Sequence, residues 1–292
     1  MAYPEQILQQ MGIMDVTGLQ PFCSEEDGAP YEVWQVQLPQ RSYVLKKAKG
    51  MEAVLYSNYL KGRSGFCPAI YSQYTADGDT WLLMEYVPGN SLCRCDRASL
   101  ARTLDSLIGM QNATWNESDP LNTFRAALLS RQNRLPYLHE PRLQAAYQAY
   151  LDEFQALPRT LCHDDLLPFN VLISQERAVL IDWEVGGILP WPTAFARLIA
   201  HTESEDNALF YMEHADKSYA ISYFYEHFLK GRGVDYTAYL RSLNLALLHE
   251  YCEWVYVGNK FGSTNTDRYR KYLAKAMCLA EDLGYEPYGC TM

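Results

Sequence analysis

The residue pattern of this chain changes near Pro88–Gly89, and that change constrains the fold most strongly. Before it, short segments alternate apolar and polar residues as strands do, and after it apolar residues recur at helical spacing. The pattern therefore predicts an α+β chain, in which a strand-rich lobe at 1–88 precedes a helical lobe at 89–292. The expected strands are 31–38, 42–47, 69–74 and 80–86, with one helix at 52–60.

Helices are predicted over most of the remaining chain. The amphipathic segments are 99–111, 122–130, 142–156, 193–202, 213–230, 235–257 and 266–283. Between them, 160–184 has the pattern of short strands and loops. The polar residues of that interruption are candidates for a functional site, because catalytic side chains often lie on loops that a rigid scaffold positions.

Composition excludes several kinds of partner. The 292 residues carry a formal net charge of −10, which argues against binding to nucleic acid, where affinity comes mainly from Lys and Arg. The chain has neither the apolar core of a secretory signal nor a run long enough to cross a membrane, so we expect no membrane partner. Its eight cysteines are then expected to be reduced thiols in a cytoplasmic protein.

Residues 163–184 hold an ordered set of polar groups that suits phosphoryl transfer. Such a reaction needs a carboxylate to orient the acceptor hydroxyl and oxygen ligands for magnesium. Asp165 and Asn170 lie five apart in a loop, and Asp182 follows two short strands joined by a turn at 174–177. A hairpin of this kind brings Asn170 and Asp182 close together, and leaves Asp165 to accept the substrate proton. Any one of these residues alone would more often be a cap or turn residue.

This segment resembles the aminoglycoside phosphotransferase and choline kinase family, whose members are relatives of the protein kinases. The family's loop runs His-Gly-Asp-x-x-x-x-Asn, and His163, Asp165 and Asn170 match it, while 181–184 matches the metal motif Ile-Asp-Trp-Glu. The resemblance implies a two-lobed protein-kinase-like fold, with Asp165 as catalytic base and Asn170 and Asp182 as magnesium ligands. It assigns His163 the part of a brace within the catalytic loop, not of an acid or base.

The chain departs from the family at three places. Asp164 and Phe169 stand where the family prefers glycine, and Asp164 adds a negative charge beside the base. The family often has an Asp about ten residues after the metal motif to anchor the loop, but 190–197 contains no acid. We therefore expect another residue to brace the loop, for example Thr193.

The nucleotide needs a cation on a rigid strand. Lys46 ends the segment Tyr43–Val44–Leu45–Lys46, which resembles the Val-Ala-Ile-Lys strand of kinases, and the family's spacing selects it over Lys47. Spacing alone does not decide between them, since a shift of one residue reverses the face of a strand. Glu52, on the following helix, is the expected ion-pair partner; the alternative is an acid stabilised by the helix dipole.

Two further segments would contact the nucleotide. The loop 24–30 is the poor counterpart of a glycine-rich loop, with Gly28 its one glycine. The segment 81–89 resembles the hinge of kinases, where the backbone of Glu85 and Val87 would hydrogen-bond the adenine edge. The alternative for the hinge is a buried strand that leaves the first lobe.

The acceptor is expected to lie against the last helices. Glu250, Glu253 and Trp254 occupy positions i, i+3 and i+4, so they can share one helix face. Two acids and an aromatic ring would suit an ammonium group through charge and cation–π contact. The alternative is a solvated acidic face with Trp254 in the core.

Together these features predict a small-molecule kinase that uses ATP and Mg²⁺. The expected reaction moves the γ-phosphoryl group to a hydroxyl of a small-molecule acceptor, such as an amino alcohol or aminosugar. A second hypothesis is a nucleotide-binding pseudoenzyme or assembly protein on the same fold, because the glycine loop is poor and the anchoring acid is missing. A hydrolase using Asp165 with His163 is a third, but it leaves Lys46 and Asn170 unexplained. The sequence leaves the oligomeric state unknown.

Overall fold

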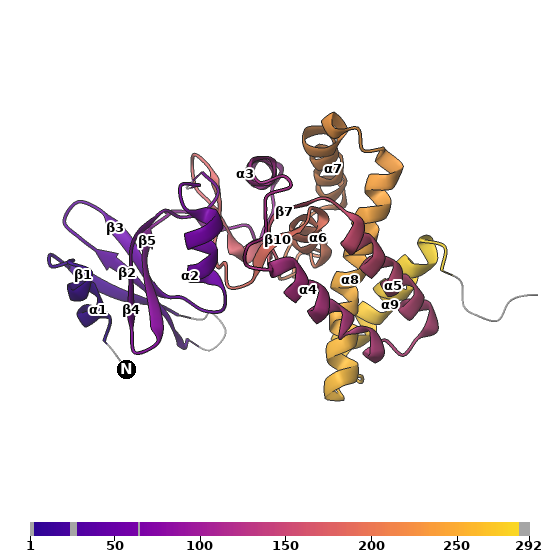
Figure 1. Cartoon of the computed structure of the whole chain (residues 1–292), viewed down its shortest axis with the longest axis horizontal. Helices are drawn as coiled ribbons and strands as arrows, with labels where there is room; N and C mark the ends of the chain where they lie inside the picture. The colour runs from indigo at the N-terminus through magenta and orange to yellow at the C-terminus, as the bar shows by residue number, and fades with distance from the viewer. Residues whose placement is uncertain (1–2, 24–27, 64, 286–292) are drawn as a thin grey trace, which may run out of the picture. The chain divides into compact units, whose positions relative to one another are not determined.

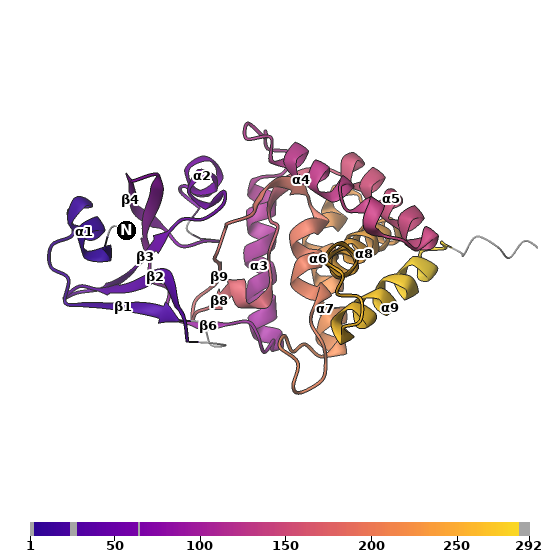
Figure 2. The same ribbon diagram turned by 90° about the horizontal axis from the view of Figure 1, so that it is seen from below.

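The computed structural model describes residues 3–23, 28–63 and 65–285, and its contacts divide the chain into two compact units. The first unit comprises Met1–Leu92 and Phe169–Val185, and the second comprises Cys93–Pro168 and Gly186–Met292. Strands dominate the first and helices the second, which confirms the predicted α+β fold (Figures 1 and 2). Each predicted lobe, 1–88 and 89–292, is one continuous segment, whereas each unit consists of two separate segments. The predicted lobe boundary stays a prediction.

The first unit is built on an antiparallel five-stranded sheet in the order β1-β2-β3-β5-β4. Turn residues fix the register of its hairpins. At the β4–β5 turn, Asp77 and Gly78 have φ angles of 53° and 86°, the left-handed conformation that a tight hairpin turn requires. The strands are β1 (Gly18–Cys23), β2 (Pro30–Gln37), β3 (Ser42–Lys47), β4 (Ile70–Ala76) and β5 (Asp79–Glu85).

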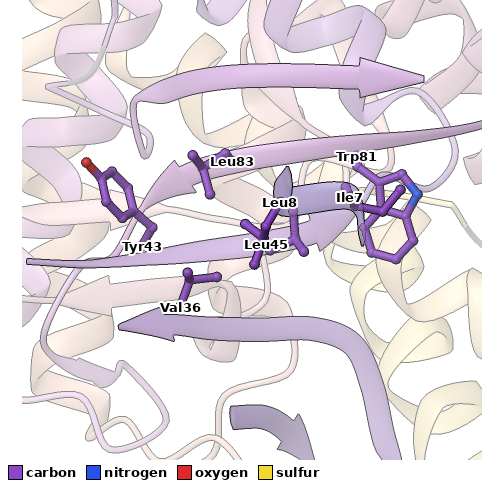
Figure 3. Close-up of a cluster of buried hydrophobic side chains, with 7 residues drawn as sticks. All are labelled: Ile7, Leu8, Val36, Tyr43, Leu45, Trp81 and Leu83. Atoms are coloured by element: carbon purple, nitrogen blue, oxygen red, sulfur yellow. The ribbon is translucent and has the colours of Figure 1, made fainter. Parts of the chain in front are cut away.

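One face of this sheet is covered by α1 (Pro4–Gln10). Ile7 and Leu8 of this helix are buried against Tyr43 and Leu45 of β3 and against neighbouring strands, as Figure 3 shows. Successive side chains of a strand point to opposite faces, so Lys46 lies on the face away from α1. The apolar packing of α1 thus fixes which face of β3 carries Lys46.

A short helix follows β3 after a tight connection. It begins as α2 (Glu52–Leu55) and continues as the π-helical turn η1 (Tyr56–Leu60), which together match the predicted helix 52–60. Gly50 has a φ of 51°, and a Cβ there would lie 2.4 Å from the carbonyl oxygen of Glu184. Since Met51 N also donates to that oxygen at 2.9 Å, the connection is held against the backbone of the metal motif.

A second, three-stranded sheet completes the first unit in the order β6-β8-β9. It consists of β6 (Asn90–Ser91), β8 (Val171–Ile173) and β9 (Ala178–Leu180), and the last two form the predicted hairpin. A Cβ on Gly89 would lie 2.3 Å from the carbonyl oxygen of Ile173, so the chain passes β8 too closely for a larger residue.

The second unit is mainly helical. Its first part holds α3 (Arg97–Ala113), α4 (Thr123–Gln132), the short turn η2 (Leu135–Tyr137) and α5 (Pro141–Ala156). Its later part holds α6 (Pro192–Ala200), α7 (His214–Phe224), the turns η4 (Tyr225–Leu229) and η5 (Lys230–Arg232), α8 (Tyr236–Phe261) and α9 (Asp267–Asp282). Asp96 and Asp235 cap α3 and α8 by accepting backbone N–H groups. A two-stranded sheet of β7 (Arg159–His163) and β10 (Gly186–Pro190) lies among these helices.

The predicted strands and helices agree with these elements to within a few residues. The sequence did not predict α1, β1, β6 or β10, and the omissions of α1 and β1 have physical reasons. Seven residues of α1 are too few for a clear helical period, and Pro21 interrupts the alternation of β1, which is an edge strand of the sheet. No helix in the part of the chain described here is long and apolar enough to span a membrane. The seven cysteines among those residues are free thiols.

Candidate active site

Lys46 lies between two carboxylates in the first unit. Its Nζ is 2.9 Å from Oε1 of Glu52 and 2.5 Å from Oδ1 of Asp182. Strand β3 supplies the lysine, the start of α2 supplies Glu52, and the segment after β9 supplies Asp182. Three residues from distant parts of the sequence thus form one ionic cluster, which we call the lysine cluster.

Burial and charge act against each other in the lysine cluster. Burial alone would lower the pKa of Lys46, but Glu52 and Asp182 outweigh it and raise that pKa above its ordinary value. The Glu52 side chain is 0% exposed, and burial raises its pKa although Lys46 opposes the shift. A charged ammonium therefore remains on β3, where it can meet a phosphate.

The neighbouring lysine has different partners. Lys47 Nζ lies 3.0 Å from Glu32 and 2.9 Å from Asp79, both of them exposed side chains. Of the two lysines that spacing could not separate, only Lys46 contacts Glu52 and the metal motif. The assignment of Lys46 to the nucleotide stays a prediction.

The β8–β9 hairpin brings Asn170 next to the metal motif. Val171 pairs with Leu180, and Ile181 N donates to the carbonyl oxygen of Asn170 at 2.9 Å. Asp182 follows directly with a φ of 64°, a left-handed conformation that Asp tolerates better than most residues. Asn170 is buried and Asp182 is half-buried, so an amide oxygen and a carboxylate lie near one end of the hairpin.

The other residues predicted to contact the nucleotide lie outside the lysine cluster. Gly28 has a φ of 71° with open space around it, while Ser24 to Asp27 of the same loop lie outside the described residues. Glu85 donates its backbone N–H to Ala69, and its carboxylate accepts from Arg177 at 2.5 Å. Val87 is buried. The adenine-binding role of Glu85 and Val87 stays a prediction.

In the second unit, His163 ends β7 and begins the catalytic loop. It is fully buried, and its Nδ1 accepts the backbone N–H of Asp165 at 3.2 Å. The carbonyl of Asp165 in turn accepts the N–H of Leu167 at 2.8 Å. His163 thus contacts the loop backbone, the position expected of a brace.

An arginine from α6 contacts the side chain of Asp165. Nε and Nη2 of Arg197 donate to Oδ1 of Asp165 at 3.0 and 2.6 Å. The third nitrogen, Nη1, donates to Oε2 of Glu250 at 2.8 Å. One guanidinium therefore joins the loop that carries Asp165 to α8. Thr193, the residue expected to brace this loop, lies on the same helix as Arg197, and its bracing role stays a prediction.

The unusual Asp164 also meets an arginine. Nη2 of Arg131 on α4 donates to Oδ1 of Asp164 at 2.5 Å, and Nε donates to the hydroxyl of Tyr150 at 2.8 Å. The Arg131 side chain is only 4% exposed, and its guanidinium lies over the ring of Phe154. The charge that replaces the family's glycine is thus balanced inside the second unit.

The three residues predicted for the acceptor all have partners within their own unit. Glu250 is buried and accepts from Arg197, and Glu253 pairs with Arg134, whose Nη2 is 3.0 Å from Oε2. Trp254 stacks on Tyr272, and Arg268 lies 4.5 Å from its ring centre. The three share one helix, but cations of the chain already occupy the positions that an ammonium group would take. Their acceptor role stays a prediction.

Arg131 and Arg197 were missed by sequence reasoning, although one signal was present. Arg197 is the single charged residue of α6, whose sequence is otherwise apolar apart from Thr193. A lone charge in an apolar helix implies a buried partner, since such residues are rarely buried unpaired. That signal indicates a partner but not its identity, because the pairing depends on tertiary contacts.

Metal ions in proteins are commonly held by groups of His, Cys, Asp or Glu side chains. Among the described residues there is no group of three or more His, Cys, Asp or Glu side chains that could hold one. This leaves open the mixed pair of Asn170 and Asp182, since magnesium commonly takes only one or two carboxylates from the protein and completes its shell with phosphate and water.

Comparison with known proteins gives the same fold. The sequence matches the profile of the phosphotransferase enzyme family over residues 26–219. A thermostable mutant of aminoglycoside phosphotransferase APH(4)-Ia is 14% identical with a TM-score of 0.58, covering 96% of this chain and 99% of that one. An aminoglycoside phosphotransferase from Alicyclobacillus acidocaldarius subsp. acidocaldarius DSM 446 is 13% identical with a TM-score of 0.58, covering 97% and 96%.

A third structure, LicA in complex with AMP, is 15% identical with a TM-score of 0.56, covering 94% of this chain and 98% of that one. No curated protein sequence matches the chain. At such low identities the similar structures establish the fold, while the profile match extends over more than half of the sequence.

Proposed function

The chain belongs to the phosphotransferase enzyme family, and from that premise we propose that it transfers the γ-phosphoryl group of ATP to a hydroxyl group of a small molecule. The observation that carries the proposal is the contact of Lys46 with both Glu52 and Asp182. A strand lysine, its helix partner and the metal-motif aspartate form one cluster. Their separation in sequence makes a chance meeting a poor explanation.

The lysine cluster is assigned to the nucleotide. Lys46 would contact the α- and β-phosphates, and Glu52 would hold its ammonium in place. The hard oxygens of Asn170 and Asp182 fit magnesium, which when bound would neutralise phosphate charge. Gly28 and the backbone of Glu85 and Val87 would complete the nucleotide contacts.

Asp165 is assigned to the acceptor. The acceptor oxygen forms a bond to the γ-phosphorus while the bond from that phosphorus to the departing ADP oxygen breaks. The proton of the acceptor hydroxyl passes to the carboxylate of Asp165. His163 contributes by binding the backbone N–H of Asp165, which orients the loop.

The first acceptors to test are amino alcohols and aminosugars. A structure of the APH(4)-Ia mutant with the same fold is described as a ternary complex with ADP and hygromycin B. Glu250 and Glu253 are already paired with arginines, which argues against a strongly cationic acceptor. The panel should therefore include neutral sugars and simple alcohols beside hygromycin B and other amines. A cytoplasmic location forms part of the same proposal, because ATP and free thiols both suit that compartment.

The test is acceptor-dependent release of ADP from Mg–ATP, with Asp165→Ala as the blank. We expect at least one acceptor to stimulate release, and the variant to be slower by about 10²–10⁴-fold, as for loss of a general base. An Asp165→Ala protein that turned over at the parental rate would refute the assignment of the base. Binding of Mg–ATP with no turnover on any acceptor would favour the alternative, a nucleotide-binding pseudoenzyme or assembly protein.

A further inference from the structure

We propose that Arg197 is a positioning residue for Asp165, and that Glu250 and His201 orient Arg197 for this purpose. The inference rests on the proposed function, because it concerns the residue assigned as catalytic base. It supplies the brace that the family obtains from an acid and that this chain lacks. It also gives Glu250 a place in the site other than binding the acceptor.

The geometry uses all three guanidinium nitrogens. Nε and Nη2 of Arg197 donate to one carboxylate oxygen of Asp165, and Nη1 donates to Glu250. A planar fork that binds at two edges fixes both the distance and the orientation of its partner. The Asp165 side chain, which is 35% exposed, is thereby held by a residue that is itself only 20% exposed.

The far side of Arg197 is anchored by two other helices. Glu250 lies on α8, and Nε2 of His201, just after α6, lies 3.1 Å from Nη1 of Arg197 and 3.4 Å from Oε2 of Glu250. Nδ1 of His201 lies 2.7 Å from the hydroxyl of Tyr272 on α9. Since Glu250 lies on α8 and His201 is held by Tyr272 of α9, Arg197 has little freedom to leave Asp165.

The charges of this group favour its ionised form. Burial alone would raise the pKa of Glu250, but Arg197 and His201 outweigh it and hold that pKa well below its ordinary range. Burial would likewise lower the pKa of Arg197, whereas Glu250 and Asp165 raise it. The arginine therefore stays charged, and Glu250 offsets part of the charge that Asp165 meets.

A lysine could not reproduce this arrangement. Its ammonium is a point charge on a flexible stem, so it can approach Asp165 or Glu250 but not present separate planar edges to both. Arg197→Lys therefore preserves charge and removes geometry. Arg134→Lys is the matched control, because Arg134 pairs with Glu253, which lies on the same helix α8 as Glu250.

Two measurements on the full chain test the inference. The first is amide hydrogen exchange at Asp165 and Leu167, whose N–H groups are both bonded within the loop. The second is steady-state kinetics with Mg–ATP and the best acceptor of the panel. Thermal unfolding of each variant checks that the second unit remains folded.

We expect Arg197→Lys to speed exchange at Asp165 and Leu167 by about tenfold, as for loss of a charge-assisted hydrogen bond, while Arg134→Lys leaves it unchanged. Misplacement of the base should lower kcat by about 10²-fold and leave KM for ATP within about twofold. Free guanidinium ion, below denaturing concentration, should restore part of kcat to Arg197→Ala and nothing to Asp165→Ala. A purely structural role would predict no such rescue.

Equal exchange in the wild type and Arg197→Lys would overturn the inference whatever the kinetics showed. Equal kcat values would overturn it as well. A wild type that turned over no acceptor would refute the proposed function, and the exchange result would still decide whether Arg197 holds the loop. The two failures are thus distinguishable.

Discussion

Lys46 in the first unit and Arg197 in the second each lie between two carboxylates, but the two cations are held differently. In the lysine cluster a single ammonium meets Glu52 and Asp182, while in the second unit Arg197 presents different edges to Asp165 and Glu250. An ammonium can lose one partner and keep the other, which suits the proposed role of Asp182 as a metal ligand. A guanidinium that moves loses its oriented hydrogen bonds as well as its ionic contact, so it is suited to holding the Asp165 carboxylate in one position.

The largest effect expected from this comparison is on the stability of the second unit. Asp164→Gly restores the family's residue, yet it leaves the buried guanidinium of Arg131 without its carboxylate partner. We expect a loss of about 3–5 kcal/mol in the free energy of unfolding, measured by denaturant titration. Removal of Asp182 from the lysine cluster should cost less, because its side chain is 36% exposed and Lys46 keeps Glu52 as a partner.

The double variant Arg131→Met with Asp164→Gly provides the control. It removes both charges and replaces the arginine by an apolar side chain that can pack on Phe154. We expect it to be more stable than Asp164→Gly alone, so that the two changes are not additive. Additive losses would mean that the pair is not energetically coupled.

The next largest effect concerns the cation of the lysine cluster. Lys46→Met should lower ADP release by about 10²–10³-fold, the range for loss of one group that stabilises charge in a transition state. Binding of Mg–AMP-PNP, followed by calorimetry, should weaken in parallel. An unchanged rate would remove Lys46 from the nucleotide site.

Lys47→Met is the matched control for that variant. Lys47 is the next residue on β3, and it pairs with the exposed side chains of Glu32 and Asp79. Exposed ion pairs contribute little, so turnover should remain within about twofold of the wild type. A comparable loss in both lysine variants would point to damage to β3 and not to loss of a phosphate contact.

The smallest expected effect is a loss of stability in the second unit at low pH, which we attribute to His249. Burial lowers the pKa of His249 well below its ordinary value, with Arg131 adding to the shift, while Glu250 opposes it and Arg134 and Arg197 reinforce it. His249 also accepts or donates a 3.1 Å hydrogen bond with Tyr147 and lies 3.7 Å from Glu253. It is therefore neutral in the folded chain.

A folded-state pKa below that of the unfolded chain stabilises the protein above about pH 6.5, and this stability is lost as the pH falls. The expected slope is at most about 1.4 kcal/mol per pH unit from this one group. Hydrogen exchange from pH 7 to pH 5 should show loss of protection in the second unit before the first. His249→Gln should flatten that dependence; an unchanged slope would assign it to other groups.

Much of the lysine cluster was predictable because its members mark the ends of regular elements. Lys46 lies one residue before the end of a strand, Glu52 starts a helix, and Asp182 follows a hairpin, so local patterns locate all three. Their mutual contact agrees with the spacing argument that favoured Lys46, although the functional roles stay predictions.

The arginine contacts could not be predicted in the same way. Arg131 and Arg197 lie in the last turns of α4 and α6, and their aspartate partners are 33 and 32 residues away along the chain. Helical periodicity identifies the buried face of each helix but not which residue of another element faces it. The same limit applies to Glu250 and Glu253, whose spacing showed a shared helix but not the arginines that meet them.

The division of the chain has a practical consequence for dissecting this protein. Unit one is discontinuous in sequence, because Phe169–Val185 contributes two strands of its three-stranded sheet along with Asn170 and Asp182. A gene fragment ending at Leu92 would encode Lys46 and Glu52 without their aspartate partner. Transferring the lysine cluster between relatives would therefore require two separate gene segments, because recombination with a single crossover would separate Lys46 and Glu52 from Asp182.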